Sequence, residues 1–420
     1  MRHKPPVYEA TPGRAGPPRY NGGVATMSFE QARACVIEKV RQAASPPPVE
    51  EVLLHQAAGR ILAAAVHADR DYPPLSRSIR DGFAVRSADL PGEFEVVGEV
   101  RAGERLDREV GPGEAVEIMT GAPVPPGADQ VVMIEHTRRE GARMATDRPP
   151  KPGEFINPQG AEVREGEEVI GPGRRIDYAT ISLLATVGTV RVPVYMKPRV
   201  AIIATGDEIV PAGARPLAHQ IRNSNAYSLA AQVVQAGGLP LILPVARDDH
   251  ASTRALVDRG LKRDLLLLSG GVSAGKYDIV EEVLAEFGAE FYFDRTLIQP
   301  GRPTVFGRAQ GTFFFGLPGN PVSTMVTFRV FAQAAVELLA GRTDPELPFL
   351  LSRLTRPFRH QPGLTRFLPA HLSPDGSELT PIDWQGSSDV AAVARANAFL
   401  VAEADRESWE AGDFMPALMK

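Results

Sequence analysis

The stretch Asp264-Leu-Leu-Leu-Leu-Ser-Gly-Gly271 is an apolar run that ends in a serine and two glycines. Two other stretches have this form: Val200-Ala-Ile-Ile-Ala204 is followed by Thr-Gly-Asp-Glu208, and Thr312-Phe-Phe-Phe-Gly316 by Leu-Pro-Gly-Asn-Pro321. Apolar runs without alternation are typical of strands buried on both faces of a parallel sheet. Open α/β sheets bind ligands beyond the carboxyl ends of such strands. The sequence therefore predicts a ligand site where these three strands end.

The residue types at these strand ends suit a phosphate or another oxyanion. Gly270 and Gly271 carry no β-carbon, so backbone N–H groups can approach an anion closely. Three acids, Glu208, Asp249 and Asp278, would repel a phosphate by themselves, and a hard divalent cation such as Mg²⁺ between them resolves the conflict. Asp is also a favoured helix N-cap, so a structural role stays open for Asp249 and Asp278.

Composition excludes several classes of protein. The chain has 420 residues, a formal net charge of −5 and one cysteine, Cys35. It lacks a long basic run, which argues against nucleic acid as the main partner. One cysteine excludes an internal disulfide and a multi-thiolate metal site, and we expect a cytoplasmic protein. No apolar stretch reaches the ~18 residues of a membrane-spanning helix.

The alternation of strand-like and helix-like segments, separated by clusters of Pro and Gly, predicts an α/β multidomain protein. Its centre is a parallel α/β sheet domain, with helices expected at 226–235, 250–262, 277–287 and 321–339 and a strand at 239–247. Short alternating runs from Phe94 to Met144, and again after Pro345, indicate two small β regions. The expected boundaries are a disordered leader (1–27), a discontinuous N-terminal domain (28–72 and 163–198), an inserted β module (73–162), the α/β domain (199–345) and a C-terminal β domain (346–420).

Two helices are expected near the start of the N-terminal domain. Ser28 and Gln31 form a capping-box pattern that opens a helix running to Gln42. A second helix is expected from Val49 to Leu62, ending at the Gly59-Arg60 break.

Eight motifs in order make the chain from Ser28 to Met419 resemble the MoeA-type molybdopterin molybdenumtransferases, the family that includes the E domain of gephyrin. Any one motif could arise by chance, but the ordered set is very specific. The motifs are Arg80-Asp-Gly-Phe-Ala-Val-Arg86, Ile118-Met-Thr-Gly-Ala-Pro-Val-Pro125, Thr205-Gly-Asp-Glu208, Arg247-Asp-Asp249, Ser269-Gly-Gly-Val-Ser-Ala-Gly275 with Asp278, Pro300-Gly-Arg-Pro303, Leu317-Pro-Gly-Asn-Pro-Val-Ser323 and Gln385-Gly-Ser387.

The resemblance implies the last step of molybdenum cofactor synthesis: molybdenum from molybdate is inserted into adenylylated molybdopterin and AMP is released. It implies catalytic roles for Asp81, Thr120, Glu208, Asp249 and Asp278, although Asp81 and Thr120 read alone are typical turn residues. It also implies that Glu208, Asp278 and Glu162 hold Mg²⁺. The substrate-binding residues would be Thr205, Gly206, Ser269, Gly270, Gly271, Val272, Ser273, Gly275, Pro318 and Pro321.

Molybdate is a tetrahedral dianion, which suits Arg and hydroxyl donors. Arg302 and Ser323, expected after adjacent strands of one sheet, are candidates, together with Ser387 and Arg366. The resemblance further implies an elongated homodimer with a cleft between the β module of one subunit and the α/β domain of the other. It also implies contacts with two kinds of partner protein, the adenylyltransferase and molybdoenzyme apoproteins.

Four positions depart from the commonest pattern of the family, and one of them is Glu162, which stands where many members have an Asp. Asn157 and Gln299 stand where Arg and Lys are frequent, and Leu364 stands where an Arg is usual, with Arg366 close by. The changes leave the nucleotide half of the pattern intact and weaken its molybdate half. Two alternatives stay open: a different nucleotide-handling enzyme with the same α/β module, such as an adenylyltransferase, or a non-enzymatic scaffold.

Overall fold

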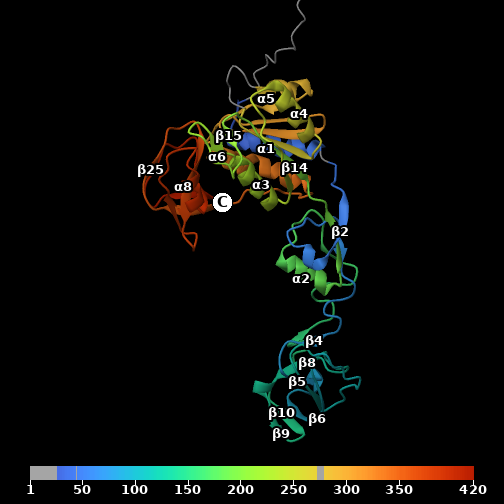
Figure 1. The fold of residues 1–420 in the computed structure, drawn as a ribbon. Coiled ribbons are helices and arrows are strands. Elements are labelled where there is room, and N and C mark those ends of the chain that lie inside the picture. Colours follow the sequence, from blue (N-terminus) through green and yellow to red (C-terminus); the bar gives the residue numbers. More distant parts are fainter. Residues whose placement is uncertain (1–25, 44, 272–278) are drawn as a thin grey trace, which may run out of the picture. The chain divides into compact units, whose positions relative to one another are not determined.

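The computed structural model describes residues 26–43, 45–271 and 279–420 (Figure 1). Contacts divide the chain into two compact units: Met1–Pro47 together with Met196–Lys420, and Pro48–Tyr195. The second unit interrupts the first in sequence. Residues near the start of the chain therefore complete a core built mostly from its second half.

Six strands form the central sheet of the larger unit, in the order β17-β14-β18-β23-β22-β19. The first four are parallel to one another, and β22 is antiparallel to both of its neighbours. From β14 the chain goes outward to β17 and then returns to the other side of β14 as β18, so the strand order reverses between β14 and β18. The strands are β14 (Arg199–Ala204), β17 (Leu239–Ile242), β18 (Leu265–Ser269), β19 (Glu290–Phe293), β22 (Val305–Ala309) and β23 (Thr312–Leu317).

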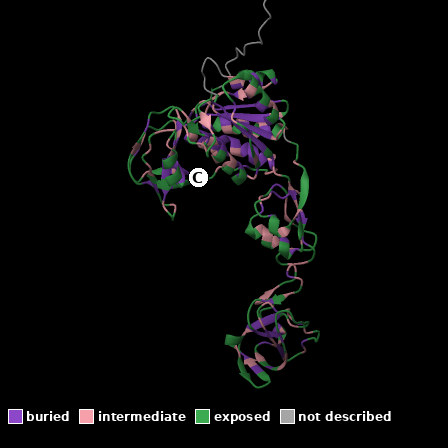
Figure 2. Ribbon diagram, viewed as in Figure 1, coloured by how far each residue is buried: buried purple, intermediate pink, exposed green. Residues whose placement is uncertain are grey.

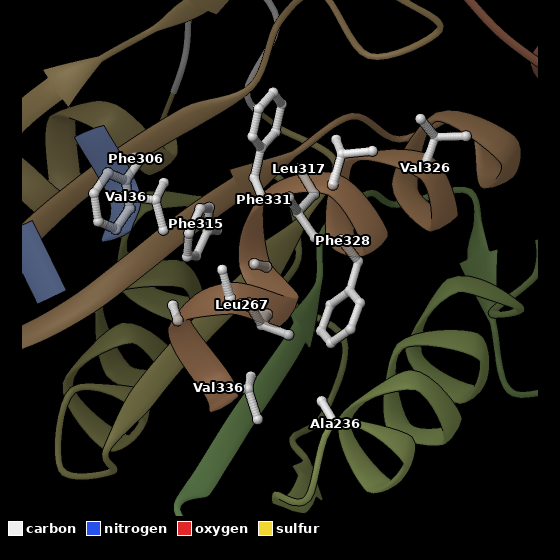
Figure 3. Packing of buried hydrophobic residues seen from close by; sticks show 14 of the residues in the cluster. Val36, Ala236, Leu267, Phe306, Phe315, Leu317, Val326, Phe328, Phe331 and Val336 are labelled. Atoms are coloured by element: carbon white, nitrogen blue, oxygen red, sulfur yellow. The ribbon is translucent and has the colours of Figure 1, made fainter. Parts of the chain in front are cut away.

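Alternate residues of β14, β18 and β23 face two hydrophobic layers, as their unbroken apolar runs predict. Ile202 and Leu267 pack with α1, α3 and the helical segment α6–α7, whereas Ile203 and Leu268 pack with α4 and α5. The sheet is buried on both faces (Figure 2), and Figure 3 shows the first layer, where Leu267 lies among Phe and Val side chains. The helices are α1 (Phe29–Ala43), α3 (Asn225–Gln235), α4 (His250–Gly260), α5 (Ile279–Glu286), α6 (Pro321–Thr327) and α7 (Gln333–Leu339).

The helix expected over 321–339 is interrupted by one turn of π-helix, Phe328–Ala332, between α6 and α7. This segment is the one helix, within the described ranges, that is long and apolar enough to cross a membrane, and 78% of its apolar window is buried inside the protein. Its apolar character is explained by its position in the core, because Phe328, Val330 and Phe331 belong to the first hydrophobic layer.

The capping box at the start of α1 is confirmed. The Ser28 hydroxyl accepts a hydrogen bond from the Gln31 N–H at 3.2 Å, and the Gln31 side chain accepts one from the Ser28 N–H at 3.0 Å. The preceding strand β1 (Thr26–Met27) pairs with β20 (Arg295–Thr296), which joins the start of the described chain to its second half.

The helix expected from Val49 to Leu62 is wrong. The chain instead forms β2 (Val49–Leu53), a 3-10 turn (Leu54–Gln56) and irregular structure. The five residues of β2 pair antiparallel with β13 (Arg191–Tyr195), a partner that lies far along the chain and is invisible to local periodicity.

The smaller unit contains two groups of elements. Around Leu62, Leu184 and Val194 a hydrophobic cluster joins β2 and β13 to β3 (Val66–His67), β12 (Glu168–Ile170) and α2 (Tyr178–Thr186). The second group is a six-stranded sheet in the order β8-β5-β7-β6-β10-β9, flanked by the pair β4–β11. Its strands are β4 (Arg77–Ser78), β5 (Gly82–Val85), β6 (Gly92–Val100), β7 (Glu114–Ile118), β8 (Gln130–Met133), β9 (Arg138–Glu140), β10 (Arg143–Thr146) and β11 (Ile156–Asn157), with 3-10 turns at Ser87–Asp89 and Ile134–His136.

The C-terminal strands close into a ring. The sheet order is β21-β26-β27-β24-β30-β28, and β28 also pairs with β26, so five strands form a closed barrel. The elements are β21 (Ile298–Gln299), β24 (Phe349–Leu354), β25 (Phe358–Arg359), β26 (Thr365–Leu372), β27 (Glu378–Pro381), α8 (Val390–Arg395), β28 (Ala398–Ala402), β29 (Ser408–Trp409) and β30 (Phe414–Met419). The predicted fold class, an α/β multidomain chain with a C-terminal β domain, is confirmed.

Candidate functional site

A cavity of about 490 Å³ opens at the carboxyl ends of β14, β18 and β23. It therefore lies at the reversal of strand order, where the fold leaves room for a ligand. Of the substrate-binding residues named from the sequence, seven line it: Thr205, Gly206, Ser269, Gly270, Gly271, Pro318 and Pro321. Val272, Ser273 and Gly275 lie outside the described residues.

Glycines allow the loops after β14 and β18 to touch. A β-carbon on Gly270 would lie 2.8 Å from the Thr205 carbonyl oxygen, and one on Gly271 would lie 2.8 Å from the Thr205 hydroxyl. Both glycines also have positive φ angles, +92° and +65°. The Thr205 side chain is buried, and its hydroxyl has no hydrogen-bond partner within the described part of the chain. Because an unpaired buried hydroxyl is costly, the cavity wall is prepared for a polar ligand.

Asn225, the first residue of α3, ties the ends of β18 and β23 together. Its Nδ2 donates to the Ser269 hydroxyl at 2.8 Å and to the Gly319 carbonyl at 2.7 Å. Its Oδ1 is buried and, among the residues described, has no partner. Asn225 lines the cavity but was missed from the sequence. A signal existed, since the polar run Asn223-Ser-Asn225 directly precedes an apolar helix.

Of the two predicted strand-end acids that the structure describes, Glu208 and Asp249, one faces the cavity. Glu208 lines it, and its carboxylate folds back so far that a β-carbon on Gly206 would collide with it. Asp249 instead caps α4 and accepts a hydrogen bond from the Ser252 N–H at 2.8 Å, which is the structural alternative noted above. Asp278 lies outside the described residues. Asp248, which the sequence did not single out, also lines the cavity.

The candidate molybdate residues are connected through their chain neighbours, by a route that the sequence did not predict. Arg302 does not follow a strand of the central sheet: it comes after β21, which pairs with β26 of the C-terminal barrel. That pairing brings Gln299, three residues before Arg302, opposite Arg366. The expectation that Arg302 and Ser323 follow adjacent strands of one sheet is therefore wrong. The sequence could not show this, because a strand of only two residues carries no signal that identifies its partner.

The same region reaches α6 and the loop before α8. A β-carbon on Gly301 would collide with the Thr327 side chain, and the Thr327 hydroxyl donates to the carbonyl of Ser323, one turn earlier, at 2.8 Å. Val322, the residue before Ser323, donates its N–H to the Ser387 carbonyl at 3.0 Å. The Arg366 Nε is buried and unpartnered within the described structure, which leaves it available to an anion. Pro303, beside Arg302, lines the cavity.

In the smaller unit, Asp81 and Thr120 meet. Asp81 Oδ1 accepts hydrogen bonds from the Thr120 backbone N–H at 2.6 Å and from its hydroxyl at 2.7 Å. These bonds, the backbone bond first, lower the pKa of Asp81 below its ordinary value, so the carboxylate is held ionised. Both residues are exposed, so this paired carboxylate is accessible from solvent.

Glu162 belongs to the same unit, where Asn157 donates to its carboxylate at 3.1 Å. Nowhere in the described ranges do three or more Asp, Glu, His or Cys side chains form a group that could hold a metal ion. A cation in the cavity would thus depend on the pair Glu208 and Asp248 together with oxygens of its ligand.

Family models cover almost the whole chain. They are the MoeA N-terminal region (domain I and II) over residues 27–188, a probable molybdopterin binding domain over 201–338 and the MoeA C-terminal region (domain IV) over 352–418. The molybdopterin molybdenumtransferase of Bacillus subtilis is 35% identical over 384 residues, which cover 88% of this chain and 89% of that protein. The molybdopterin molybdenumtransferase of Nostoc is 37% identical over 308 residues, 71% of each chain.

Solved structures give the same picture. A molybdopterin biosynthesis MoeA protein from Pyrococcus horikoshii matches with a TM-score of 0.74 and 31% identity, covering 94% of this chain and 99% of the other. A second structure of a MoeA protein from this archaeon matches with a TM-score of 0.80 and 26% identity, covering 94% and 100%.

Proposed function

Because this chain belongs to the MoeA family of molybdopterin molybdenumtransferases, it is a transferase of molybdenum cofactor biosynthesis, and we propose that it takes adenylylated molybdopterin and releases AMP as it inserts molybdenum. The cavity at the ends of β14, β18 and β23 is the proposed site of the nucleotide half of this substrate. The observation that carries the proposal is a pair of buried polar atoms on residues of its wall, Thr205 Oγ1 and Asn225 Oδ1, that have no partner among the residues the structure describes. A polar ligand of the cavity would satisfy both.

Mg²⁺ is part of the proposal, and the residues fit it. Mg²⁺ sites use one or two carboxylates and complete their coordination with water and substrate phosphate, so Glu208 and Asp248 on the cavity wall suffice. Bound there, the cation would neutralise charge on the phosphate that leaves with AMP. Asp278 and Glu162 stay predicted ligands.

Molybdate, the second substrate, is assigned to Arg302, Arg366, Ser323 and Ser387. The support is chemical: an oxyanion needs donors, and the buried Nε of Arg366 lacks an acceptor within the described structure. Gln299 removes one positive charge from this side relative to the commoner Lys. We propose that Arg366, opposite Gln299 in the β21–β26 pair, supplies the charge that Leu364 does not.

We also propose a cytoplasmic homodimer whose active site combines Asp81 and Thr120 of one subunit with Glu208 of the other. Exposed apolar side chains on the edge strand β17, Leu239, Leu241 and Ile242, are consistent with a buried subunit interface. In the structure, residues 26–43 pack with the larger unit through β1 and α1. The other domain boundaries given above, the leader before residue 26, and contacts with the adenylyltransferase and with molybdoenzyme apoproteins belong to the same proposal.

The test is molybdate-dependent release of AMP from adenylylated molybdopterin, followed by chromatography. We expect AMP to appear only when the enzyme, Mg²⁺ and molybdate are all present. An adenylyltransferase would instead consume ATP and molybdopterin, and a scaffold would release nothing. Failure of the purified full chain to release AMP under these conditions would refute the proposal.

A further inference from the structure

The Asn225 amide has one orientation only. A carbonyl oxygen such as that of Gly319 cannot donate, so the atom 2.7 Å from it has to be Nδ2 and not Oδ1. The second bond of Nδ2, to Ser269, holds the same amide from the neighbouring strand end. Oδ1 consequently points away from both partners, as an acceptor that finds no donor in residues 26–43, 45–271 and 279–420.

This fixed acceptor restricts what can bind against it. A phosphate or molybdate dianion offers oxygens that only accept, so neither can pair with Oδ1. The nearby Glu208 and Asp248 side chains add further acceptors to the same cavity. Thr205 Oγ1 and the Ser269 hydroxyl can each donate or accept, so they can pair with either kind of ligand atom and do not discriminate between donors and acceptors.

We propose that Asn225 is a specificity-determining residue whose Oδ1 accepts a hydrogen bond from an uncharged N–H or O–H donor on the nucleoside half of the substrate. The ligand is therefore oriented with a ribose hydroxyl or the base amino group against Asn225 and with its phosphate elsewhere. This inference rests on the proposed function. It adds that the ligand group against Asn225 is a hydrogen-bond donor, and that the nucleoside end of the substrate faces Asn225. A site built around such an acceptor discriminates strongly against analogues that lack the donor, because the buried acceptor is then left unpaired.

The experiment measures Kd by calorimetry for AMP and three analogues with the full chain and Mg²⁺. The analogues are 2′-deoxy-AMP, 3′-deoxy-AMP and purine riboside monophosphate, which lacks the 6-amino group. We expect one analogue to bind about tenfold or more weakly than AMP, which identifies the donor as a ribose hydroxyl or the base amine. In Asn225→Ala, the ratio between AMP and that analogue should fall to about one.

A structural role for Asn225 would weaken all four ligands equally and leave their ratios unchanged. Gln232→Ala is the matched control. Gln232 lies on the same helix, and its Nε2 donates to the Met325 carbonyl at 3.0 Å. Like Asn225 Oδ1, its Oε1 is buried and has no hydrogen-bond partner among the described residues. Gln232 does not line the cavity, so this variant should keep the wild-type ratios.

Equal affinity of the wild type for all four ligands would overturn the inference while leaving the proposed function standing. So would an effect of Asn225→Ala that disappears when Mg²⁺ is removed, since the donor would then be metal-bound water. No binding of AMP at all would overturn both proposals.

Discussion

Glu208 combines two properties that make it the sharpest single-residue test of the site. Its carboxylate lines the cavity, yet the side chain is exposed, so an amide of the same shape is tolerated by the fold. Glu208→Gln should lower molybdate-dependent AMP release about a hundredfold or more, because a lost cation ligand weakens neutralisation of phosphate charge by several kcal/mol. Turnover at saturating Mg²⁺ measures this, and Asp278→Asn should behave alike. Wild-type rates in either variant would refute its assignment.

The Asp81–Thr120 pair makes a prediction about ionisation. The two bonds from Thr120 stabilise the carboxylate, so Asp81 should stay ionised as pH falls through the range in which an ordinary Asp is protonated. Thr120→Val keeps the backbone donor and removes the hydroxyl, so the pKa of Asp81 should rise while remaining below its ordinary value. Carboxyl carbon chemical shifts followed against pH measure both values. An unchanged pKa would mean that the hydroxyl bond does not form in solution.

The sign of the linked stability follows from the direction of the shift. A carboxyl whose folded pKa is lowered contributes stability that is complete above its unfolded pKa and is lost as pH falls through the folded pKa. In Thr120→Val this contribution should be smaller, and its loss should be complete at a higher pH than in the wild type. Because Asp81 is exposed, its ionisation contributes little to the free energy of unfolding. The effect of Thr120→Val on the rate of AMP release is therefore more informative than its effect on stability.

At the scale of elements, the π-turn between α6 and α7 depends on an arginine from the other end of the chain. Arg33 of α1 donates to the Val330 carbonyl at 2.8 Å and to the Pro345 carbonyl at 2.7 Å. Burial lowers the pKa of Arg33 to about 10, with Glu337 acting in the opposite direction. A wider helical turn changes which carbonyls are bonded within the helix, and a guanidinium can serve those left over.

Arg33→Leu should therefore destabilise the larger unit by about 2–4 kcal/mol, because two buried carbonyls lose charged donors. Arg41→Ala is the control, since Arg41 also reaches the 343–344 segment but is half exposed, and its loss should cost about 0.5 kcal/mol. Urea unfolding of both variants measures the difference. Similar midpoints for the two would show that the Arg33 bonds are not structurally important.

The same scale shows what the sequence could predict. The strands β14, β18 and β23 are recognisable because their own residues carry the signal, as in Leu265–Ser269. A helix start such as Ser28 is likewise capped by a residue three positions away. The nature of 49–62 depends on a partner strand at 191–195, and the sheet that contains Ile298–Gln299 depends on 365–366. Pairings over such separations leave no local trace.

For the candidate site, the sequence predicted which loops line the cavity and what kind of ligand suits them. It did not predict every residue that lines the cavity. Glycines and a threonine after apolar runs were enough to predict Thr205, Gly270 and Gly271, since topology alone brings strand ends together. Asn225 was missed because its role comes from two bonds across the sheet. Asp249 was ambiguous because capping and catalysis use the same carboxylate, and the structure shows the cap.

At the scale of the whole molecule, a shared active site has a quantitative signature. Asp81 belongs to the unit Pro48–Tyr195 and Glu208 to the other unit. If the cleft joins units from different subunits, a mixed dimer of Asp81→Ala and Glu208→Ala chains contains one intact site and one doubly defective site. Random mixing should then restore roughly a quarter of wild-type activity, because half of the dimers are mixed and each has one good site of two.

Co-expression of the two chains with different tags, followed by tandem purification, isolates the mixed dimers for assay. Homodimers of each variant are the controls and should be inactive. Complete inactivity of verified mixed dimers would show that each site is built within one subunit.

The interrupted order of the units also bears on how this protein is made by the ribosome. The smaller unit is a continuous segment and emerges complete, so it can fold while translation continues. Strand β1 and helix α1, synthesised before it, have to wait for β20 and α7, which emerge only in the last third of the chain. The amphipathic α1 thus stays without its core partners during most of synthesis. Slowing translation after residue 195 should prolong that exposure and increase dependence on chaperones that shield apolar surfaces.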